Sequence, residues 1–328
     1  MTQSNIQAFE ADIREQYCNI AGLLVQRDGK SLYEGYFNGY TAEHAAHVFS
    51  VTKSVFSLLI GIAVDQGKIG SIDQLVLDFF PDYPILAGEK TIQQVTIKHL
   101  LTMTAPYKYE TEPYERFFAS LNPIRDALDL LGGDKPIGEF HYSAIGGTHI
   151  LSGILQRATG QSALEFATEH LFRPLGISVP RSITLKSAEE HFAVMNDPTT
   201  RGWVADPQGH NFASWGLFLT PQEMALIGQL CLQNGVWNGE RIVSADWIAQ
   251  STREQSRCLQ LGNLAYGYLW WVLDADRFAA LGDGGNVIYG NRNNNMVIAI
   301  ASLLSPDVKD RIEWIQTQVE PLFYGVCD

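Results

Sequence analysis

The sequence predicts an α/β (α+β) fold: one antiparallel sheet built from both ends of the chain and flanked by helices, with an inserted all-helical domain. Strand-like patterns occur near the N-terminus and again beyond about residue 261. Helical patterns dominate between them, from about residue 71 to residue 242. Because strands at both ends must bury apolar faces, the most economical arrangement joins them into a single sheet.

The N-terminal part begins with a helical pattern over residues 5–17 and continues as a hairpin. Residues 21–27 are apolar, and residues 30–37 alternate between apolar and polar positions. Asp28-Gly29 between them is a strong signal for a two-residue turn. We therefore expect the first two strands to pair with each other.

Residues 51–66 form a largely apolar segment that ends just before Gly67. Glycine commonly follows the last turn of a helix because it adopts a left-handed backbone conformation without strain. A helix with so few polar positions is typical of the protein interior. We therefore expect a buried helix here.

The middle of the chain carries helical patterns that are separated by loops with Gly, Pro and Asp. They cover residues 97–103, 124–131, 147–159, 163–171 and 221–234. Strand patterns then return at residues 266–273, 278–281, 286–289 and 296–303, and a helical pattern follows at 307–323. We expect a discontinuous sheet domain of residues 1–75 and 240–328, a helical domain of residues 76–239, and an active site in the cleft between them.

Composition narrows the classes of partner and location. The chain has 36 acidic and 23 basic residues, a formal net charge of -13, which disfavours nucleic acid and anionic membrane surfaces as partners. No apolar run approaches the ~18–20 residues that span a bilayer, and no basic segment followed by an apolar run opens the sequence. Four cysteines show no metal-ligand spacing: Cys18, Cys231, Cys258 and Cys327. We expect reduced thiols in a cytoplasmic protein, or a periplasmic protein if a leader has been removed.

Ser50 and Lys53 stand at the start of the predicted buried helix. A spacing of three residues places both side chains on one helical face. The serine also lies near the unpaired backbone N–H groups of the helix start. Apolar surroundings lower the pKa of a lysine and make a neutral amine available as a base. The pair therefore predicts a nucleophilic serine activated by lysine; an ordinary helix cap beside a surface lysine is the alternative.

A second motif, His141-Tyr142-Ser143-Ala144, lies in a loop just before the apolar segment 147–159. A tyrosine at a domain junction can reach the nucleophile, but a phenol has an unperturbed pKa of about 10. A nearby lysine ammonium is needed to make it a useful base or proton shuttle. The alternative is a buried tyrosine whose hydroxyl is hydrogen-bonded.

A third motif, Gly282-Asp283-Gly284-Gly285-Asn286, lies on or before a C-terminal strand. Small residues allow a substrate to lie against a strand backbone, whose N–H groups can stabilise an oxyanion. The alternative is a tight hairpin turn. The motif is not a dinucleotide-binding fingerprint, because the third glycine is absent and no helix follows.

These three motifs, in this order, resemble those of the β-lactamase-like serine hydrolases. That superfamily has the β-lactamase/transpeptidase-like fold and includes class C β-lactamases, penicillin-binding proteins, D-aminopeptidases and carboxylesterases, with SxxK as its signature. The resemblance covers nearly the whole chain. The segments that carry it include FSVTKSV, TIKHLLTMTA, FHYSAIGGTHILSGILQRATGQ, YGYLWWV and LGDGGNVIYG.

The resemblance implies that Ser50 attacks the substrate carbonyl while Lys53 and Tyr142 share the work of the general base. It places the oxyanion between the backbone N–H groups of Ser50 and Asn286. An acyl-enzyme then forms and is released by water, with Tyr142 as the base. Which of Lys53 and Tyr142 takes the first proton stays open, because the two groups titrate together.

The resemblance also implies a set of substrate-binding positions: Ala144, Asp283, Gly284, Gly285 and Asn286. Two of them depart from the class C pattern. Ala144 replaces an asparagine that binds the substrate amide, and Asp283 replaces a lysine or histidine that helps to hold a substrate carboxylate. An aspartate repels such a carboxylate. We therefore expect a hydrolase of small-molecule esters, or of neutral or cationic amides, more than a β-lactam-specific enzyme.

Two other functions stay open on the sequence alone. One is a true β-lactamase or D-amino-acid peptidase with relaxed motifs, and the other is a catalytically inactive binding or regulatory module. We expect no cofactor and no metal, since the HxxH spacing of His44 and His47 lacks a third ligand at a recognisable distance. The oligomeric state is left open.

Overall fold

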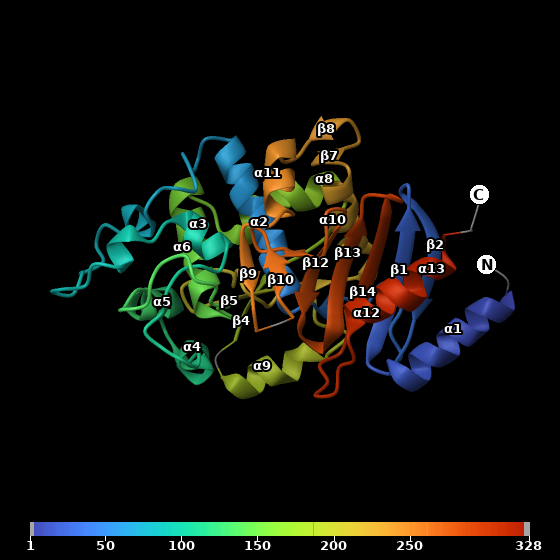
Figure 1. Cartoon of the computed structure of the whole chain (residues 1–328). Coiled ribbons are helices and arrows are strands. Elements are labelled where there is room, and N and C mark those ends of the chain that lie inside the picture. The colour runs from blue at the N-terminus through green and yellow to red at the C-terminus, as the bar shows by residue number, and fades with distance from the viewer. Residues whose placement is uncertain (1–2, 186, 261, 325–328) are drawn as a thin grey trace.

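The structure, a computed structural model of the chain, describes residues 3–185, 187–260 and 262–324. Within these residues the main sheet has eight strands in the order β2-β1-β14-β13-β12-β11-β10-β9, and neighbouring strands are antiparallel (Figure 1). The strands are β1 Ile20–Arg27, β2 Lys30–Tyr36, β9 Ser256–Cys258, β10 Leu264–Tyr266, β11 Trp271–Val272, β12 Arg277–Gly282, β13 Asn286–Asn291 and β14 Met296–Ser302. Pairing of β1 with β14 joins the two ends of the chain, which confirms the predicted sheet.

The hairpin of β1 and β2 turns where the sequence predicts. Arg27 pairs with Lys30, and the two residues between them have positive φ angles, 53° at Asp28 and 76° at Gly29. A turn with two positive φ angles matches the right-handed twist of the flanking strands. The short Asp-Gly turn therefore sets the register between β1 and β2, and β14 pairs with the other edge of β1.

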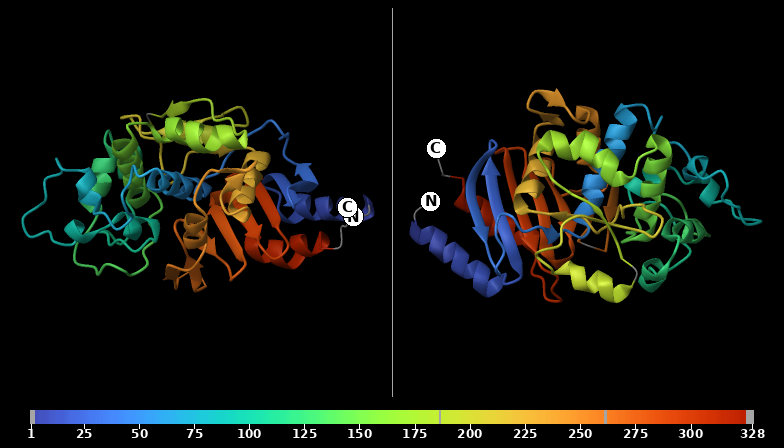
Figure 2. Two further views of the ribbon diagram at one scale, coloured as in Figure 1. Left: turned by 90° about the horizontal axis from the view of Figure 1, so that it is seen from above. Right: turned by 180° about the vertical axis from the view of Figure 1, so that it is seen from behind.

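Helices cover both faces of the sheet (Figure 2). On one face α1 (Gln3–Gln16) packs against the C-terminal helical segment, which starts with α12 (Arg311–Trp314), and Tyr17 stacks on Trp314. On the other face α10 (Pro221–Leu232) lies across β1, β13 and β14. Gly228 allows this approach, because a Cβ there would be 2.7 Å from Val297 and 2.9 Å from Ile288. Thus α10, grouped by sequence with the helical domain, packs on the sheet.

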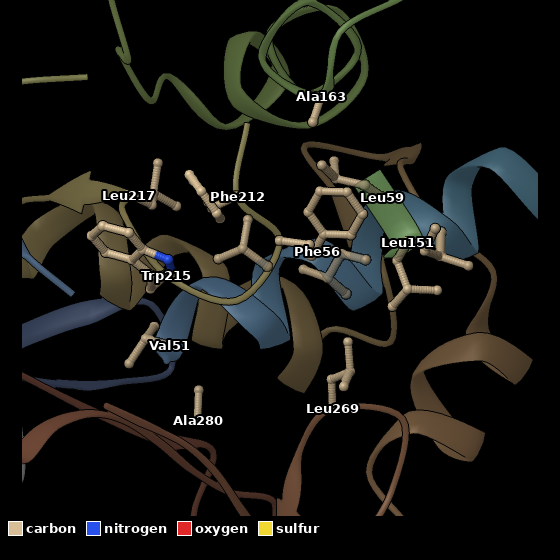
Figure 3. Packing of buried hydrophobic residues seen from close by; sticks show 14 of the residues in the cluster. Val51, Phe56, Leu59, Leu151, Ala163, Phe212, Trp215, Leu217, Leu269 and Ala280 are labelled. Atoms are coloured by element: carbon tan, nitrogen blue, oxygen red, sulfur yellow. The ribbon is translucent and has the colours of Figure 1, made fainter. Parts of the chain in front are cut away.

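Helix α2 (Val51–Asp65) runs through the centre of the protein. Its residues from Val51 to Ala63 are buried, which confirms the predicted buried helix, and Gly67 follows it with a φ of 68°. Its apolar side chains pack with residues from several other elements, as Figure 3 shows for Phe56, Leu59 and Leu151. The body of this helix is therefore held in place by packing with several other elements.

The segment between α2 and α10 supplies a helical region beside the sheet (Figure 1). Its helices are α3 Ile97–Leu101, α4 Tyr114–Ala119, α5 Pro123–Leu130, α6 Gly146–Thr159, α7 Ala163–Ala167, α8 Arg173–Leu175 and α9 Ala188–Met195. Helix α6 contacts α2, α3 and α5. The helical region thereby reaches the central helix through α6.

Two predicted elements differ in the structure. The run predicted as one strand at 266–273 divides into β10 and β11, because Leu269 adopts a φ of 61° and the Gly267 N–H bonds to the Trp270 carbonyl at 2.8 Å. The last helix begins at Arg311 instead of residue 307, because the Asp310 carboxylate accepts hydrogen bonds from two backbone N–H groups of its first turn.

No helix in the described ranges is long and apolar enough to cross a membrane. Cys18, Cys231 and Cys258 carry free thiols, whereas Cys327 lies outside the described residues. The expected cytoplasmic location stays a prediction.

Replacement Phe56→Ala removes a fully buried ring that contacts Trp203 edge-on, with 6.1 Å between ring centroids. We expect the free energy of unfolding to fall by about 3–5 kcal/mol, because lost burial adds to the cost of a cavity. Denaturant titration measures it. The exposed Phe192, 67% accessible, provides the matched control, and Phe192→Ala should change stability by less than about 0.5 kcal/mol. Equal losses in both variants would contradict this account of the core.

Candidate active site

Ser50 occupies the residue before the first turn of α2, at a strained point of the backbone. Phe49 immediately before it has a φ of 47°, a conformation that residues with a Cβ adopt rarely. The buried His47 ring helps to hold it, because its Nδ1 accepts the Phe49 N–H at 3.2 Å. Ser50 caps no backbone N–H of α2 with its side chain. Its hydroxyl is therefore available for other chemistry.

Lys53 is buried, with 1% of its surface exposed, and its amine has three polar neighbours. Nζ lies 2.9 Å from Ser50 Oγ, 2.7 Å from the Ala144 carbonyl and 3.1 Å from the Ser214 carbonyl. Burial lowers the pKa of Lys53 to about 8, although the charges of Glu112 and Asp283 act in the opposite direction. A substantial fraction of the amine is therefore neutral near physiological pH.

The partners of the Lys53 amine determine where its lone pair points. A neutral amine has two N–H groups and one lone pair, and a carbonyl oxygen can only accept. The carbonyls of Ala144 and Ser214 therefore take the two N–H groups. Ser50 Oγ is the one neighbour that can donate, so the lone pair faces the serine proton. This arrangement suits a lysine that deprotonates a serine.

Tyr142 lies beside the same pair. Nζ of Lys53 is 5.1 Å from the centre of the Tyr142 ring, which stacks on Trp271 with 6.0 Å between centroids. Burial raises the pKa of the Tyr142 phenol, while its hydrogen bond with Ser50 opposes the rise. The phenol therefore stays protonated at neutral pH. It is placed to pass on a proton rather than to act as a resting base.

Glu112 is a buried residue beside the candidate site that the sequence did not point to. Its carboxylate is buried and accepts hydrogen bonds from Ser143 Oγ at 2.9 Å and from three successive backbone N–H groups: Ala144 at 2.6 Å, Ile145 at 3.1 Å and Gly146 at 2.7 Å. It thereby closes the N-terminus of α6 and fixes the loop whose Ala144 carbonyl holds Lys53. Glu112 is more than thirty residues from these partners in the sequence, and no local motif predicts such a contact.

Gly282 brings strand β12 against the start of α2. A Cβ at this position would be 2.3 Å from the Val48 carbonyl oxygen and 3.2 Å from the backbone nitrogen atoms of Ser50 and Val51. Only a residue without a side chain allows this approach. Asp283, the next residue, is therefore placed close to Ser50 and lines the same cavity.

In the described chain, the rest of the third motif does not line the cavity that contains Ser50, where the resemblance placed the Asn286 N–H. Asn286 is fully buried, and its side chain bonds to the Asp283 carbonyl at 2.7 Å and to Ser302 in the neighbouring strand. Gly284, Gly285 and Asn286 line a neighbouring cavity next to α12, which Asp283 also borders. The chain turns at Asp283–Gly285 between β12 and β13, so Asn286 already belongs to the second strand of this hairpin.

A cleft of about 570 Å³ opens in front of Ser50. Besides Ser50 it is bordered by Tyr142, Ala144 and Asp283, so the structure brings these predicted residues together. Most of its other walls are aromatic: Phe49, Tyr114, Phe118, Phe192, Trp215 and Trp271. Of the lining residues in the described part of the chain, Asp283 alone is charged.

The two histidines of the HxxH spacing take part in local hydrogen bonds. Nδ1 of His44 accepts the Thr41 N–H at 3.1 Å, and that of His47 accepts the Phe49 N–H. Burial lowers the pKa of His47 to about 3, so its ring is neutral. Across the described ranges, no group of three or more His, Cys, Asp or Glu side chains is placed to hold a metal ion.

Comparison with protein families places these features in a known context. The family model described as Beta-lactamase matches residues 6–320. The chain belongs to the β-lactamase family. This membership confirms the resemblance drawn from the motifs and the predicted fold.

Relatives within the β-lactamase family carry several different names. The 6-aminohexanoate-dimer hydrolase of Paenarthrobacter ureafaciens is 24% identical over 319 residues, which cover 90% of this chain and 75% of that protein. Penicillin-binding protein 4 of Amycolatopsis lactamdurans is 25% identical over 297 residues, covering 85% and 77%. The family thus includes hydrolases and penicillin-binding proteins of similar distance from this chain.

Solved structures share the β-lactamase fold with this chain. A putative 6-aminohexanoate-dimer hydrolase from Bacillus anthracis superposes with a TM-score of 0.71 at 19% identity, covering 98% of this chain and 81% of that one. A family VIII carboxylesterase superposes with a TM-score of 0.68 at 17% identity, covering 93% of both chains. At these identities the likeness establishes the fold.

Replacement Glu112→Gln tests whether this carboxylate positions the Ala144 loop. An amide offers one acceptor oxygen where the carboxylate offers two, and it turns an NH₂ group toward N–H donors. We expect the free energy of unfolding to fall by about 1–3 kcal/mol and kcat on an accepted ester to fall about tenfold or more.

The exposed Glu115 provides the matched control, and Glu115→Gln should alter neither quantity appreciably. Thermal unfolding and steady-state kinetics measure the two effects. If Glu112→Gln loses stability but keeps full kcat, Glu112 supports the fold without positioning the site.

Proposed function

We propose that this protein is a serine hydrolase that cleaves small ester or amide substrates through an acyl-enzyme on Ser50, with esters preferred over β-lactams. The observation that carries the proposal is the set of partners around the Lys53 amine. Two carbonyl acceptors take its N–H groups, and Ser50 Oγ lies 2.9 Å away on the remaining side. A buried amine with a pKa of about 8 in this position is suited to remove the serine proton.

In the proposed first half-reaction, Ser50 Oγ attacks the substrate carbonyl and its proton passes to Lys53. The carbonyl oxygen gains negative charge, which backbone N–H groups can stabilise. We assign this role to the N–H of Ser50 and the N–H of Asp283. The close approach of Gly282 to the start of α2 supports Asp283 in place of Asn286, because Asp283 follows Gly282 directly and lines the cleft, whereas Asn286 is not among the lining residues of the described chain.

Collapse of the tetrahedral intermediate breaks the bond to the leaving group, which needs a proton. The protonated phenol of Tyr142 can supply it and regain one from the Lys53 ammonium. The products are an acyl-Ser50 ester and a free alcohol or amine. Water then takes the place of the leaving group and the same proton transfers run in reverse, which releases a carboxylic acid and restores Ser50.

The preference for esters over β-lactams rests on the borders of the cleft. Ala144 has no side-chain amide with which to bind a substrate amide. Asp283 brings a negative charge where a substrate carboxylate would need a positive one. Lys53 is buried beneath Ser50 and directs its N–H groups at backbone carbonyls, so it is not available to such a carboxylate.

Replacement Ser50→Ala should abolish turnover of a short-chain chromogenic ester, with a loss of at least about a thousandfold in kcat. Ser54→Ala is the matched control, because the Ser54 hydroxyl donates to the Leu269 carbonyl inside the core and does not border the cleft. A serine-directed phosphonate should add covalently to Ser50, as mass spectrometry of the peptide would reveal.

A chromogenic cephalosporin provides the competing substrate. Turnover at an efficiency equal to that of the ester would favour a true β-lactamase. Absence of both turnover and phosphonate adduct would favour an inactive binding module and would overturn the proposal.

The pH dependence follows from Lys53. Neutral amine is the reactive form, so kcat/KM for a neutral ester should rise with pH and level off above a pH of about 8. The pKa of Tyr142 is raised, so its phenol should stay protonated over this range. A steady-state pH profile measures this. A rise that continues toward the ordinary lysine pKa of about 10.4 would show that Lys53 is not desolvated as described.

A further inference from the structure

Asp283 presents a negative charge to the cleft that no basic group neutralises. The residue is exposed, borders the cleft and follows Gly282, which touches the start of α2. Other acids of the protein are engaged: Asp126 pairs with Arg116, and Asp274 with Arg277. In the residues that the structure describes, the Asp283 carboxylate makes no such pair and no side-chain hydrogen bond.

The charge of Asp283 acts across the site. Burial lowers the pKa of Lys53, and the Asp283 charge opposes this change. Burial raises the pKa of Tyr114 and Tyr142, and the Asp283 charge adds to that rise. No lysine, arginine or histidine of the described chain lines the cleft, so Asp283 supplies the one charge at its wall. That charge favours a cationic substrate over an anionic one.

Aromatic faces surround the same space. Of the aromatic residues that line it, Tyr114 is 46% exposed and Phe192 is 67% exposed. Such rings attract cations through their electron-rich faces, and they suit a weakly hydrated quaternary ammonium better than a strongly hydrated primary amine. A carboxylate combined with aromatic walls therefore favours a bulky organic cation.

We propose that the cleft selects esters that carry a quaternary or tertiary ammonium group, which lies between the Asp283 carboxylate and the aromatic walls. This inference rests on the proposed function, because it names the substrate class of the same site. It assigns Asp283 a side-chain role in specificity in addition to the role of its backbone N–H.

Two pairs of isosteric esters test the proposal. Butyrylcholine and 3,3-dimethylbutyl butyrate differ by a charge in the alcohol. The 4-nitrophenyl esters of 4-(trimethylammonio)butyrate and 5,5-dimethylhexanoate differ by a charge in the acyl chain. In at least one pair we expect kcat/KM to be about five- to tenfold higher for the cation. In Asp283→Asn this ratio should fall to about twofold or less.

Asp307→Asn is the control for the loss of one negative charge. Asp307 is exposed, close in sequence to the lining residue Leu304, and does not itself border the cleft. This variant should keep the ratio of the unsubstituted protein. Asp283→Lys should invert the preference toward 4-nitrophenyl hydrogen glutarate over its neutral methyl ester. Because each result is a ratio within one variant, a general loss of activity does not obscure it.

Binding of choline gives a readout that needs no turnover. In Ser50→Ala, choline should change the tryptophan fluorescence of the protein more strongly than 3,3-dimethylbutanol, and Asp283→Asn should remove the difference. The proposal would be overturned if the cationic and the neutral ester of each pair had the same kcat/KM. It would also be overturned if the preference for the cation remained in Asp283→Asn. In both cases Ser50-dependent ester hydrolysis would still stand. Failure to hydrolyse any ester, with choline binding intact, would overturn the proposed function instead.

Discussion

The burial of the Lys53 amine against two backbone carbonyls is the constraint on which the rest of the site depends. A lysine is costly to bury unless its polar atoms are paired. Here the carbonyls of Ala144 and Ser214 pair with it and at the same time orient it toward Ser50. Both carbonyls must be held in place, because a shift of either would turn the amine away from the serine. The residues around the site hold these two carbonyl groups in position.

Three parts of the chain share that task. Glu112 fixes the loop that carries Ala144 by accepting hydrogen bonds from its backbone. The segment that carries Ser214 runs along the start of α2, where the Val48 N–H bonds to the Leu217 carbonyl at 2.9 Å. From the sheet, Gly282 closes the remaining side. The site is thus assembled from backbone atoms of distant segments, and its chemistry depends on tertiary packing more than on any one motif.

Local signals in the sequence predicted the fold and the contact between Ser50 and Lys53, whereas the catalytic roles of Ser50, Lys53 and Tyr142 stay predictions. Strand patterns at both ends of the chain predicted the sheet in which β1 pairs with β14. The spacing of Ser50 and Lys53 predicted that their side chains lie in contact. Glu112 could not be predicted, because its partners are some thirty residues away and its own surroundings are an ordinary polar loop. The resemblance placed the Asn286 N–H at the oxyanion, and the sequence does not show at which residue this hairpin turns. One turn at Asp283–Gly285 decides which residue faces the cleft.

The pairing of β1 with β14 has a consequence for the order of events on the ribosome. Ser50 and Lys53 are synthesised early, but Gly282 and the strand that supports it emerge more than two hundred residues later. Until β14 arrives, one edge of the N-terminal hairpin has unpaired N–H and C=O groups and can associate with other chains. The nascent protein therefore carries Ser50 and Lys53 long before the strand that packs against them is made. The same strand pairing closes the open edge of the hairpin and completes the surroundings of Ser50.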